Sequence, residues 1–455
     1  MHLSLLAVLA WVHGGGVNSM QQLGDPLYFS EYQYGSLSGM SFSNDGSIVA
    51  IGDTRCDLIS QYGSGCTRIY QWNGSLWNKL GSTITGAESY SYSGKAVSLS
   101  GNGRIIAIGE KIDNKDGMRV FEWNASSGVW DQKGNSIKEQ QMDTASKYHI
   151  SISNDGTIVA IGSRFNDDNG QDAGRVRIFQ YDSTDWQQMG HSIKGETAGD
   201  FQGQSVSLSH NGMVVAIGAP APSNENARGK TSVFEWNSSA WNQRGDNIIG
   251  SDNDIKMGTI VSLSADGNRV AVSGTTFSRT IRVYEWNNTT WTPFGQQIII
   301  DFQGSDSMVL DSRGIRLAVG TRDKALIYDI INGIWTLDFT LQDDNKSFYG
   351  KYTSLSGDGS TVSLSSVLAN SNYQQQVQLF QIPMSPTAGP TTSPTTSPTE
   401  SEEESNEKEP DAALIGGIAG GVGGAALLGG VGYYVYTQYY AMAPVMTFNV
   451  GKLIF

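Results

Sequence analysis

Between residues 40 and 364 the chain repeats one pattern of polar and apolar positions seven times: a serine-rich alternating segment, a turn ending in glycine, and a run of small aliphatic residues. The copies read SFSNDGSIVAIG, SLSGNGRIIAIG, SISNDGTIVAIG, SLSHNGMVVAIG, SLSADGNRVAVS, VLDSRGIRLAVG and SLSGDGSTVSLS. Period-two alternation predicts strands, and the Gly-containing polar pairs predict tight turns. Each copy is therefore predicted to form two neighbouring strands.

Two more strands follow in most copies. The third reads TRIYQW, MRVFEW, VRIFQY, TSVFEW or IRVYEW, and the fourth runs from Trp through Gly, as in WQQMGHSI. The turn glycines are 45 to 57 residues apart, which is the period of a four-stranded propeller blade. The pattern predicts an all-β, seven-bladed β-propeller over residues 20–382.

The seventh unit ends after its third strand, VQLFQI, whereas the chain has MQQLGDPL at Met20–Leu27, which is similar to the fourth strand WQQMGHSI. We expect this N-terminal strand to pair with the last blade and close the ring. Closure removes the exposed edges that an open array of strands would present to other chains.

The ends of the chain have other compositions. An apolar run at Leu3–Val12 predicts a signal peptide within residues 1–19. Residues 383–411 are rich in Ser, Thr, Pro and acidic residues and predict a disordered stalk. The uncharged residues 412–440 predict one transmembrane helix, leaving residues 441–455 as a short cytoplasmic tail.

These segments predict a single-pass type I plasma-membrane protein with an extracellular propeller. Small residues four apart at Gly416, Gly420 and Gly424 suit close helix packing and hence self-association in the membrane. A lipid anchor that replaces the C-terminal apolar segment is the alternative.

A secreted chain can carry disulfides and N-linked sugars. The only two cysteines, Cys56 and Cys66, fall in one connection of the first blade and predict a disulfide; two free thiols are the alternative. Six Asn-x-Ser/Thr glycosylation acceptors occur. They are Asn73, Asn124, Asn237, Asn287, Asn288 and Asn345, and all but Asn345 follow a third strand.

The sequence contains no evident catalytic constellation. The net charge of −14 with only 16% charged residues argues against nucleic-acid binding. No His/Cys cluster has zinc-ligand spacing, and no glycine-rich phosphate loop is present. A propeller glycosidase would need converging arginines and acids; Arg164, Arg175, Arg177 and Arg228 are candidates, although we favour solvated or strand-pairing roles.

Oxygen ligands at Asn166, Asp168 and Asp172 would suit calcium, with a solvated loop as the favoured alternative. Aromatic residues before the first strands could stack on sugar rings or pack between blades, and we favour packing. These are Tyr32, Tyr34, Tyr90, Tyr92, Phe201, Phe302, Phe348 and Tyr349.

The segment GDFQGQSVSLSHNGMVVAIGAPAP, residues 199–222, resembles an FG-GAP repeat of the integrin-alpha N-terminal propeller type through Phe201, Gly203, Ala216 and Pro220. The resemblance implies a seven-bladed extracellular adhesion or ligand-binding propeller. The family's calcium-binding D-x-D-x-D-G run is replaced here by turns such as SLSHNG, which lack its carboxylates.

The expected function is therefore non-catalytic binding of a glycan, a matrix component or a cell-surface protein. The alternatives are a propeller glycosidase or lyase that acts on extracellular polysaccharide, and a structural cell-coat protein.

Overall fold

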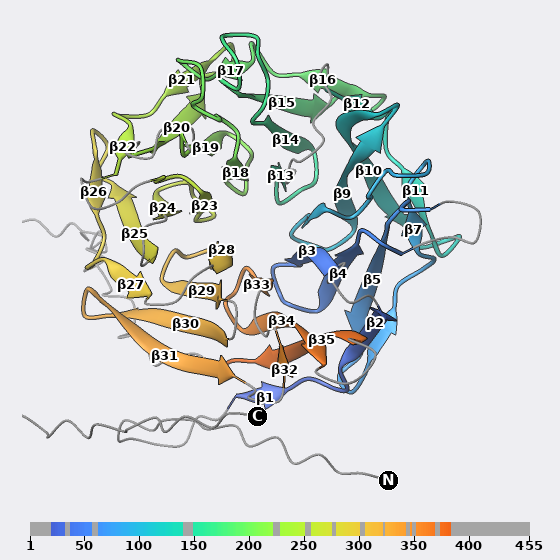
Figure 1. Ribbon diagram of the computed structural model, residues 1–455. Helices are drawn as coiled ribbons and strands as arrows, with labels where there is room; N and C mark the ends of the chain where they lie inside the picture. The colour runs from blue at the N-terminus through green and yellow to red at the C-terminus, as the bar shows by residue number, and fades with distance from the viewer. Residues whose placement is uncertain are drawn as a thin grey trace, which may run out of the picture. The chain divides into compact units, whose positions relative to one another are not determined.

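Each repeat unit forms one antiparallel sheet of the computed structural model, and the seven sheets are arranged in a ring (Figure 1). The structure describes residues 20–31, 37–56, 62–139, 149–221, 228–250, 256–274, 279–300, 305–321, 324–342, 346–347, 352–368 and 374–383. The predicted signal peptide, stalk, transmembrane segment and tail, including Gly416, Gly420 and Gly424, lie outside these ranges. Among the described residues we find no helix with the length and hydrophobicity that a membrane crossing requires.

The first four blades follow one plan. Blade 1 contains β3 (Leu37–Phe42), β4 (Ile48–Asp53), β5 (Cys66–Trp72), β6 (Trp77–Lys79) and β7 (Ile84–Thr85). Blade 2 contains β8 (Ala96–Leu99), β9 (Ile105–Ile112), β10 (Lys115–Asn124), β11 (Val129–Gln132) and β12 (Ile137–Lys138). Blade 3 contains β13 (His149–Ile152), β14 (Ile158–Ser163), β15 (Arg175–Tyr181), β16 (Trp186–Gln188) and β17 (Ile193–Lys194). Blade 4 contains β18 (Ser205–Leu208), β19 (Val214–Ala219), β20 (Lys230–Trp236), β21 (Trp241–Gln243) and β22 (Ile248–Ile249).

Blade 5 repeats this plan, and blades 6 and 7 vary it. Blade 5 contains β23 (Ile260–Leu263), β24 (Arg269–Ser273), β25 (Arg279–Trp286), β26 (Trp291–Pro293) and β27 (Ile298–Ile300). Blade 6 contains β28 (Ser305–Leu310), β29 (Arg316–Thr321), β30 (Lys324–Ile331) and β31 (Ile334–Gln342). Blade 7 contains β32 (Lys346–Ser347), β33 (Thr353–Leu355), β34 (Thr361–Leu368) and β35 (Gln374–Gln381), completed by β1 (Gln21–Gln22) and β2 (Leu27–Glu31).

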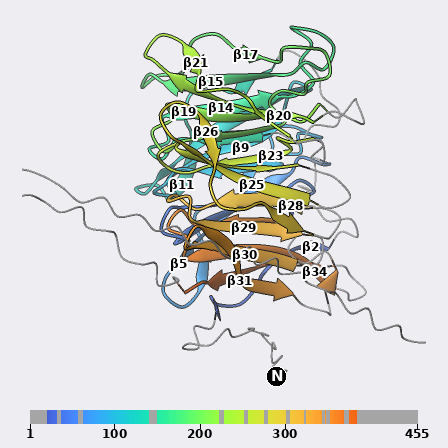
Figure 2. The ribbon, with the colours of Figure 1, turned by 90° about the vertical axis from the view of Figure 1, so that its left-hand side faces the viewer.

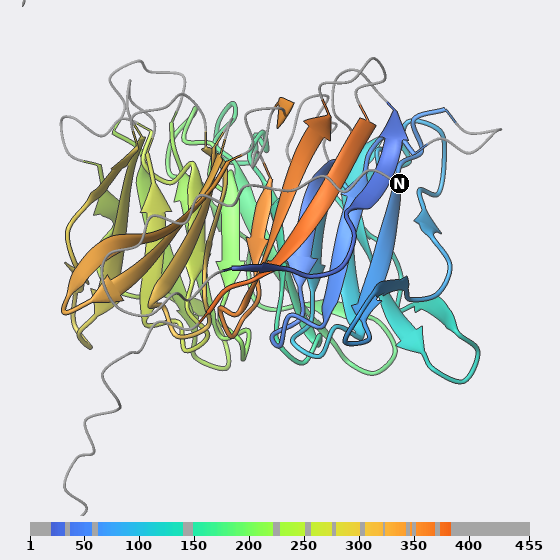
Figure 3. The ribbon, with the colours of Figure 1, turned by 90° about the horizontal axis from the view of Figure 1, so that it is seen from below.

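The N-terminal segment closes the ring as predicted. In β1, Gln22 pairs with Phe380, and in β2, Leu27 pairs with Val377 of the same strand β35. Between the two pairs, the Leu23 amide donates to the Leu379 carbonyl at 2.8 Å. The blue N-terminal strands accordingly lie beside the orange strands of blade 7 (Figure 3).

The strands run across the thickness of the ring, so their connections gather on two opposite faces (Figure 2). We call the face that carries the connections between first and second strands, and between third and fourth strands, the turn face. The other face, which carries the second-to-third connections and the links between blades, is the loop face. This division follows from up-and-down strand order.

Among the described residues, the hydrophobic core consists of seven clusters, each shared by two neighbouring blades. Between blades 1 and 2, for example, Ile48 and Ile69 pack with Val97, Ile106 and further residues. The seventh cluster joins blades 6 and 7 and includes Met20 of the closing segment. Burial of apolar area is the main favourable term in folding. Here it stabilises the contacts between neighbouring blades rather than a single central core.

A tryptophan hydrogen bond crosses six of the seven junctions between blades. The indole N–H at the start of a fourth strand donates to a backbone carbonyl of the preceding blade, in the segment that directly follows its own fourth strand. The pairs are Trp77 to Leu23, Trp130 to Leu80, Trp186 to Lys133, Trp241 to Met189, Trp291 to Arg244 and Trp335 to Phe294, at 2.7 to 3.0 Å. The glycine of the W-x-x-x-G pattern fits this contact: a Cβ on Gly134, whose φ is 69°, would lie 2.8 Å from Trp186.

The junction between blades 6 and 7 has Met20 in place of the tryptophan, and a buried arginine contributes there. Arg316, 2% exposed, binds both carboxylate oxygens of Asp329 at 2.6 and 2.7 Å. It also donates to the carbonyls of Gly359 and Pro383 in blade 7. A bidentate ion pair with its remaining donors satisfied can be accommodated in a buried position.

A closed ring of backbone hydrogen bonds links the inner turns on the turn face. Each bond runs from the amide of one turn to the carbonyl of the next. The order is Asn44, Gly101, Asn154, His210, Ala265, Ser312 and Gly357, and the Asp358 amide returns to Asn44, all at 2.7 to 2.8 Å. Two side-chain contacts span this ring: Asn44 with Asn154 at 2.5 Å, and His210 with Ser312 at 3.2 Å. The ring links all seven blades near the axis.

The repeated S-x-S sequence has a separate role for each serine. The first, such as Ser98, accepts a hydrogen bond from the backbone of the next blade, here the Ile152 amide at 3.2 Å. The second, such as Ser100, accepts from the Ile105 amide at 2.9 Å and donates to Asn102 within its own turn. Polar residues at buried positions are thus satisfied by the backbone.

We expect Trp130→Phe to lower the free energy of unfolding by about 1–3 kcal/mol, because it removes an inter-blade hydrogen bond and leaves a small cavity. Trp123→Phe is the matched control: Trp123 pairs with Trp130 across the hairpin, but its indole N–H has no partner among the described residues. Chemical denaturation measures both losses. Equal losses would contradict a specific role for the inter-blade bond.

We expect stability to fall as the pH drops through 3.8, the ordinary pKa of aspartate, because Asp45, Asp155 and Asp266 have lowered pKa values. Partial burial acts in the opposite direction, but hydrogen bonds from turn residues such as Ser153 outweigh it. A carboxylate with a depressed folded-state pKa stabilises the protein above its unfolded pKa, and that contribution is lost as the folded form is protonated. Thermal melting at a series of pH values measures this effect. As the pH is lowered, the melting temperature of Asp155→Asn should fall less than that of the unmodified chain.

Candidate functional site

The links between blades are held on the loop face by pairing with the preceding blade. Parallel bridges join Gly65 to Ser93, Gly174 to Gln202, and Gly229 to Met257. The chain entering each blade therefore lies along the second-to-third connection of the blade before it. Side chains from two blades are brought together at every such pair, which makes the loop face the place where a composite surface can form.

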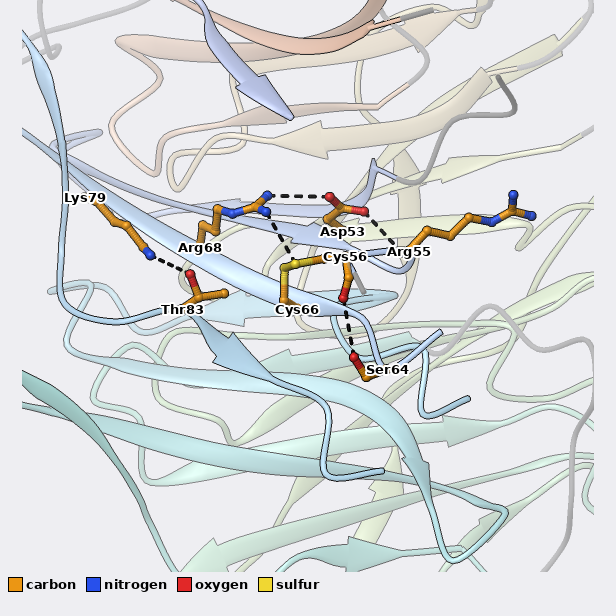
Figure 4. Close-up of a disulfide and its surroundings, with 8 residues drawn as sticks. All are labelled: Asp53, Arg55, Cys56, Ser64, Cys66, Arg68, Lys79 and Thr83. Atoms are coloured by element: carbon orange, nitrogen blue, oxygen red, sulfur yellow. Dashed lines mark hydrogen bonds and ion pairs between the residues drawn. A yellow bond between two sulfur atoms is a disulfide. The ribbon is translucent and has the colours of Figure 1, made fainter. Parts of the chain in front are cut away.

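The disulfide closes the connection that contains Gly65, the residue bridged to Ser93. Cys56 and Cys66 are bonded, with their Cα atoms 5.5 Å apart, as the sequence predicted (Figure 4). Arg68 lies against the bond, with Nη2 3.4 Å from Cys56 Sγ and Nη1 3.5 Å from Asp53. Asp53 and the two cysteines form the one potential metal-binding trio in the described part of the chain. Because both sulfurs are in the disulfide, this group is explained by the covalent bond.

An exposed group of tyrosines lies beside this connection. Tyr62, between the two cysteines in sequence, is 70% exposed, and Tyr90, in the link to blade 2, is 53% exposed. Their ring centroids are 5.7 Å apart, and Tyr90 is 6.4 Å from Tyr92. The ammonium of Lys111 lies 5.7 Å from the Tyr92 centroid. We call Tyr62, Tyr90, Tyr92 and Lys111 the tyrosine patch.

The equivalent aromatic residue of blade 4 is arranged differently. Phe201, which aligns with Tyr92, is 8% exposed and packs edge-on against Phe165 at 5.3 Å. The packing role that the sequence favoured therefore fits Phe201 but does not fit Tyr90. Tyr32, Tyr34, Phe302, Phe348 and Tyr349 lie outside the described residues.

Three of the four arginines proposed from sequence make side-chain contacts within the fold: Arg164 donates to Gln204 at 2.6 Å, and the other two are Arg175 and Arg177. Arg175 and Arg177 of blade 3 both bind Glu139, which follows β12 of blade 2, at 2.5 and 2.7 Å. Arg175 and Glu139 are almost fully buried. A buried group of this kind orients neighbouring blades, and removing one partner would leave an unpaired charge.

The residues proposed for calcium lie beside this group. The Asp168 carboxylate contacts Arg175 at 2.6 Å and Lys194 at 3.6 Å. Burial raises the pKa of Asp168, but these cations outweigh burial and hold it below its usual value. Asn166 is buried and its side chain accepts from the Asp168 amide, whereas Asp172 occupies a left-handed conformation with φ 55°. Calcium would have to compete with Arg175, and its binding here stays a prediction.

Five glycosylation acceptors lie exposed in equivalent hairpins of the turn face: Asn73, Asn124, Asn237, Asn287 and Asn288. Asn345 lies outside the described residues. The Asn73 side-chain oxygen accepts from the amides of Ser75 and Leu76, both at 2.9 Å, and from the Ser75 hydroxyl at 3.0 Å. The N-x-S pattern thus has a structural use as a turn cap.

Blade 3 shows that this cap works without a glycosylation acceptor. Asp182 occupies the equivalent position and accepts from the Thr184 amide and hydroxyl at 2.9 and 2.6 Å. These hydrogen bonds, that from the Thr184 hydroxyl first, hold the Asp182 pKa well below its ordinary value. The recurrence of Asn-x-Ser/Thr is therefore explained in part by the hairpin itself.

The sequence did not single out Tyr62, and it grouped Tyr90 with packing residues. A signal was nevertheless present in the repeats, because GAESYSYSG aligns with GETAGDFQG and places Tyr90 opposite Gly199. No family model matches this chain, and no curated protein matches it.

We expect Asn73→Ala to lower the free energy of unfolding by about 1 kcal/mol through loss of the cap, whereas Asn73→Asp should stay close to the unmodified chain, as Asp182 illustrates. Protein produced without glycosylation isolates this effect, measured by thermal melting. Equal destabilisation by both variants would contradict the capping role. In protein from a secretory host, Asn73→Asp should lose one glycan by mass.

Proposed function

We propose that this protein is a non-catalytic ligand-binding propeller of the cell surface, which presents its loop face to an extracellular ligand. The observation that carries the proposal is the tyrosine patch, an exposed aromatic group supplied by two blades and placed beside a disulfide. Exposed aromatic side chains on a rigid scaffold are typical of binding surfaces.

The contrast between the two faces supports this choice of surface. On the turn face, polar side chains such as Asn73 and Asp155 are used to cap their own turns. On the loop face, Tyr62 and Tyr90 are largely exposed although large aromatic residues gain most from burial. The exposed pair Tyr62 and Tyr90, which comes from two neighbouring blades and is in ring contact, is therefore the part of the loop face that we propose for binding.

The FG-GAP resemblance supports a binding role by analogy of fold. Phe201 packs beneath its loop, and Gly203 has φ 88°, where a Cβ would lie 3.0 Å from the Gly162 Cα. Both motif residues thus have structural uses in this chain. The ligand must be argued from the loop-face residues, since a fold alone does not specify a function.

The proposed cell-surface location rests on the sequence of the two chain ends, together with the disulfide. A disulfide persists in oxidising compartments, and Cys56–Cys66 is formed here. Glycans on the exposed hairpin asparagines would cover the turn face and leave the loop face accessible. The two faces would then have separate roles, one shielded and one binding.

Added glycans can test which face binds. Ser89→Asn creates an Asn-Tyr-Ser acceptor on the loop face, and Asp182→Asn creates an Asn-Ser-Thr acceptor in the bare hairpin of blade 3 on the turn face. The full-length chain from a secretory host, in mild detergent, is applied to an array of extracellular polysaccharides and matrix proteins.

We expect the Ser89→Asn glycan to abolish the binding seen with the unmodified chain, and the Asp182→Asn glycan to leave it unchanged. A mobility shift reversed by endoglycosidase confirms that each glycan is attached. Binding that survives the loop-face glycan, or is lost with the turn-face glycan, would place the ligand elsewhere. An array without any bound component would count against the binding function.

A further inference from the structure

We infer that the tyrosine patch is a subsite for an acidic polysaccharide, with a pyranose ring on the faces of Tyr62 and Tyr90 and a sugar carboxylate on Lys111. The inference rests on the proposed loop-face binding function and names its ligand class. It is carried by a departure from the repeat, by the backbone that positions the rings, and by a lysine without an acidic partner.

Tyr90 occupies a left-handed backbone conformation for which blade 4 has a glycine at the aligned position. Its φ is 62°, and the aligned residue of blade 4 is Gly199, with φ 78°. A large aromatic residue in the left-handed region is strained, and such strain is concentrated at functional sites. Since the Tyr90 ring is 53% exposed, burial within the fold does not offset this cost.

Backbone hydrogen bonds position the two rings together. The Tyr90 amide donates to the Tyr62 carbonyl at 2.9 Å, and the Tyr92 amide donates to the Gly63 carbonyl at 3.0 Å. The connection that presents Tyr62 is closed by the Cys56–Cys66 disulfide. The patch is therefore preorganised, which lowers the entropic cost of binding a ligand.

The ring geometry suits a sugar better than a flat aromatic ligand. Tyr62 and Tyr90 are inclined by 62°, and Tyr90 and Tyr92 by 57°. Inclined rings offer separate faces at successive angles, which fits the puckered C–H surface of a pyranose chain, whereas a planar ligand would need parallel faces. Each tyrosine also carries a hydroxyl that can hydrogen-bond to sugar hydroxyls.

Lys111 indicates that the sugar is acidic. Its ammonium lies over Tyr92, and no carboxylate pairs with it among the described residues. Of the two acids that flank the patch in sequence, Asp113 binds Lys138 at 2.6 Å, and Glu88 accepts a hydrogen bond from the Asp113 amide at 2.7 Å. A cation beside exposed aromatic rings provides an ion pair for a uronic-acid carboxylate.

The test compares an oligogalacturonate with a dextran oligosaccharide of the same length, titrated into the full-length chain by calorimetry. Tyr90→Gly is the main variant because glycine is native at the aligned position of blade 4. We expect it to weaken oligogalacturonate binding about tenfold and to leave the melting temperature unchanged or raised. Tyr62→Ala should weaken binding similarly.

Two further variants separate stacking from charge. Lys111→Gln should weaken binding of the oligogalacturonate and remove its preference over dextran. Tyr28→Ala, which removes a tyrosine of equal exposure on β2, should have no effect on either ligand. Added salt should weaken the charged interaction and not the stacking.

Three results would overturn the inference. One is oligogalacturonate binding that is absent or unaffected by Tyr90→Gly and Tyr62→Ala. Another is a drop in melting temperature for Tyr90→Gly, which would show that the ring stabilises the fold. The third is loss of a protein ligand from the array with Tyr90→Gly, without any oligogalacturonate binding, which would make the patch a protein-binding surface. If Ser89→Asn still blocks array binding while Tyr90→Gly does not, the loop-face function stands and only the subsite fails.

Discussion

The contact between neighbouring blades is the constraint on which the rest of the structure depends. A four-stranded sheet alone exposes two hydrophobic faces, and here each face is buried only against another blade. The indole of a residue such as Trp186 adds a directed hydrogen bond to this packing, and Gly134 leaves room for the ring. Because every blade is stabilised by its neighbours, closure by β1 and β2 completes the first and last junctions together.

The two faces of the ring use this framework differently. On the turn face, short hairpins are capped by Ser, Asp or Asn, and the same geometry accounts for much of the Asn-x-Ser/Thr pattern. On the loop face, the link into one blade pairs with a connection of the previous blade, as at Gly65 and Ser93. Residues distant in sequence become neighbours there, so a variable surface can form without disturbing the repeat.

The tyrosine patch illustrates how such a surface departs from its repeat. The link into blade 4 has Gly199 and a buried Phe201, whereas the link into blade 2 has the exposed Tyr90 in the same left-handed conformation. The fold does not require the Tyr90 ring, because glycine serves the aligned position. The disulfide, Tyr62 and Lys111 gather at the same place, which gives this junction a composition that no other described junction shares.

The sequence by itself determined the propeller, its seven blades, the closing strand and the disulfide, because each depends on local periodicity or on cysteines close in the chain. The roles of the two serines in S-x-S, the ring of turn hydrogen bonds and the pairing of Glu139 with Arg175 and Arg177 were decided only by tertiary structure. So was the patch, since Tyr62 and Tyr90 belong to different blades and the sequence does not show which rings are buried. Periodicity reports which face of a strand is apolar, but contacts between separate connections depend on how the blades are placed around the axis.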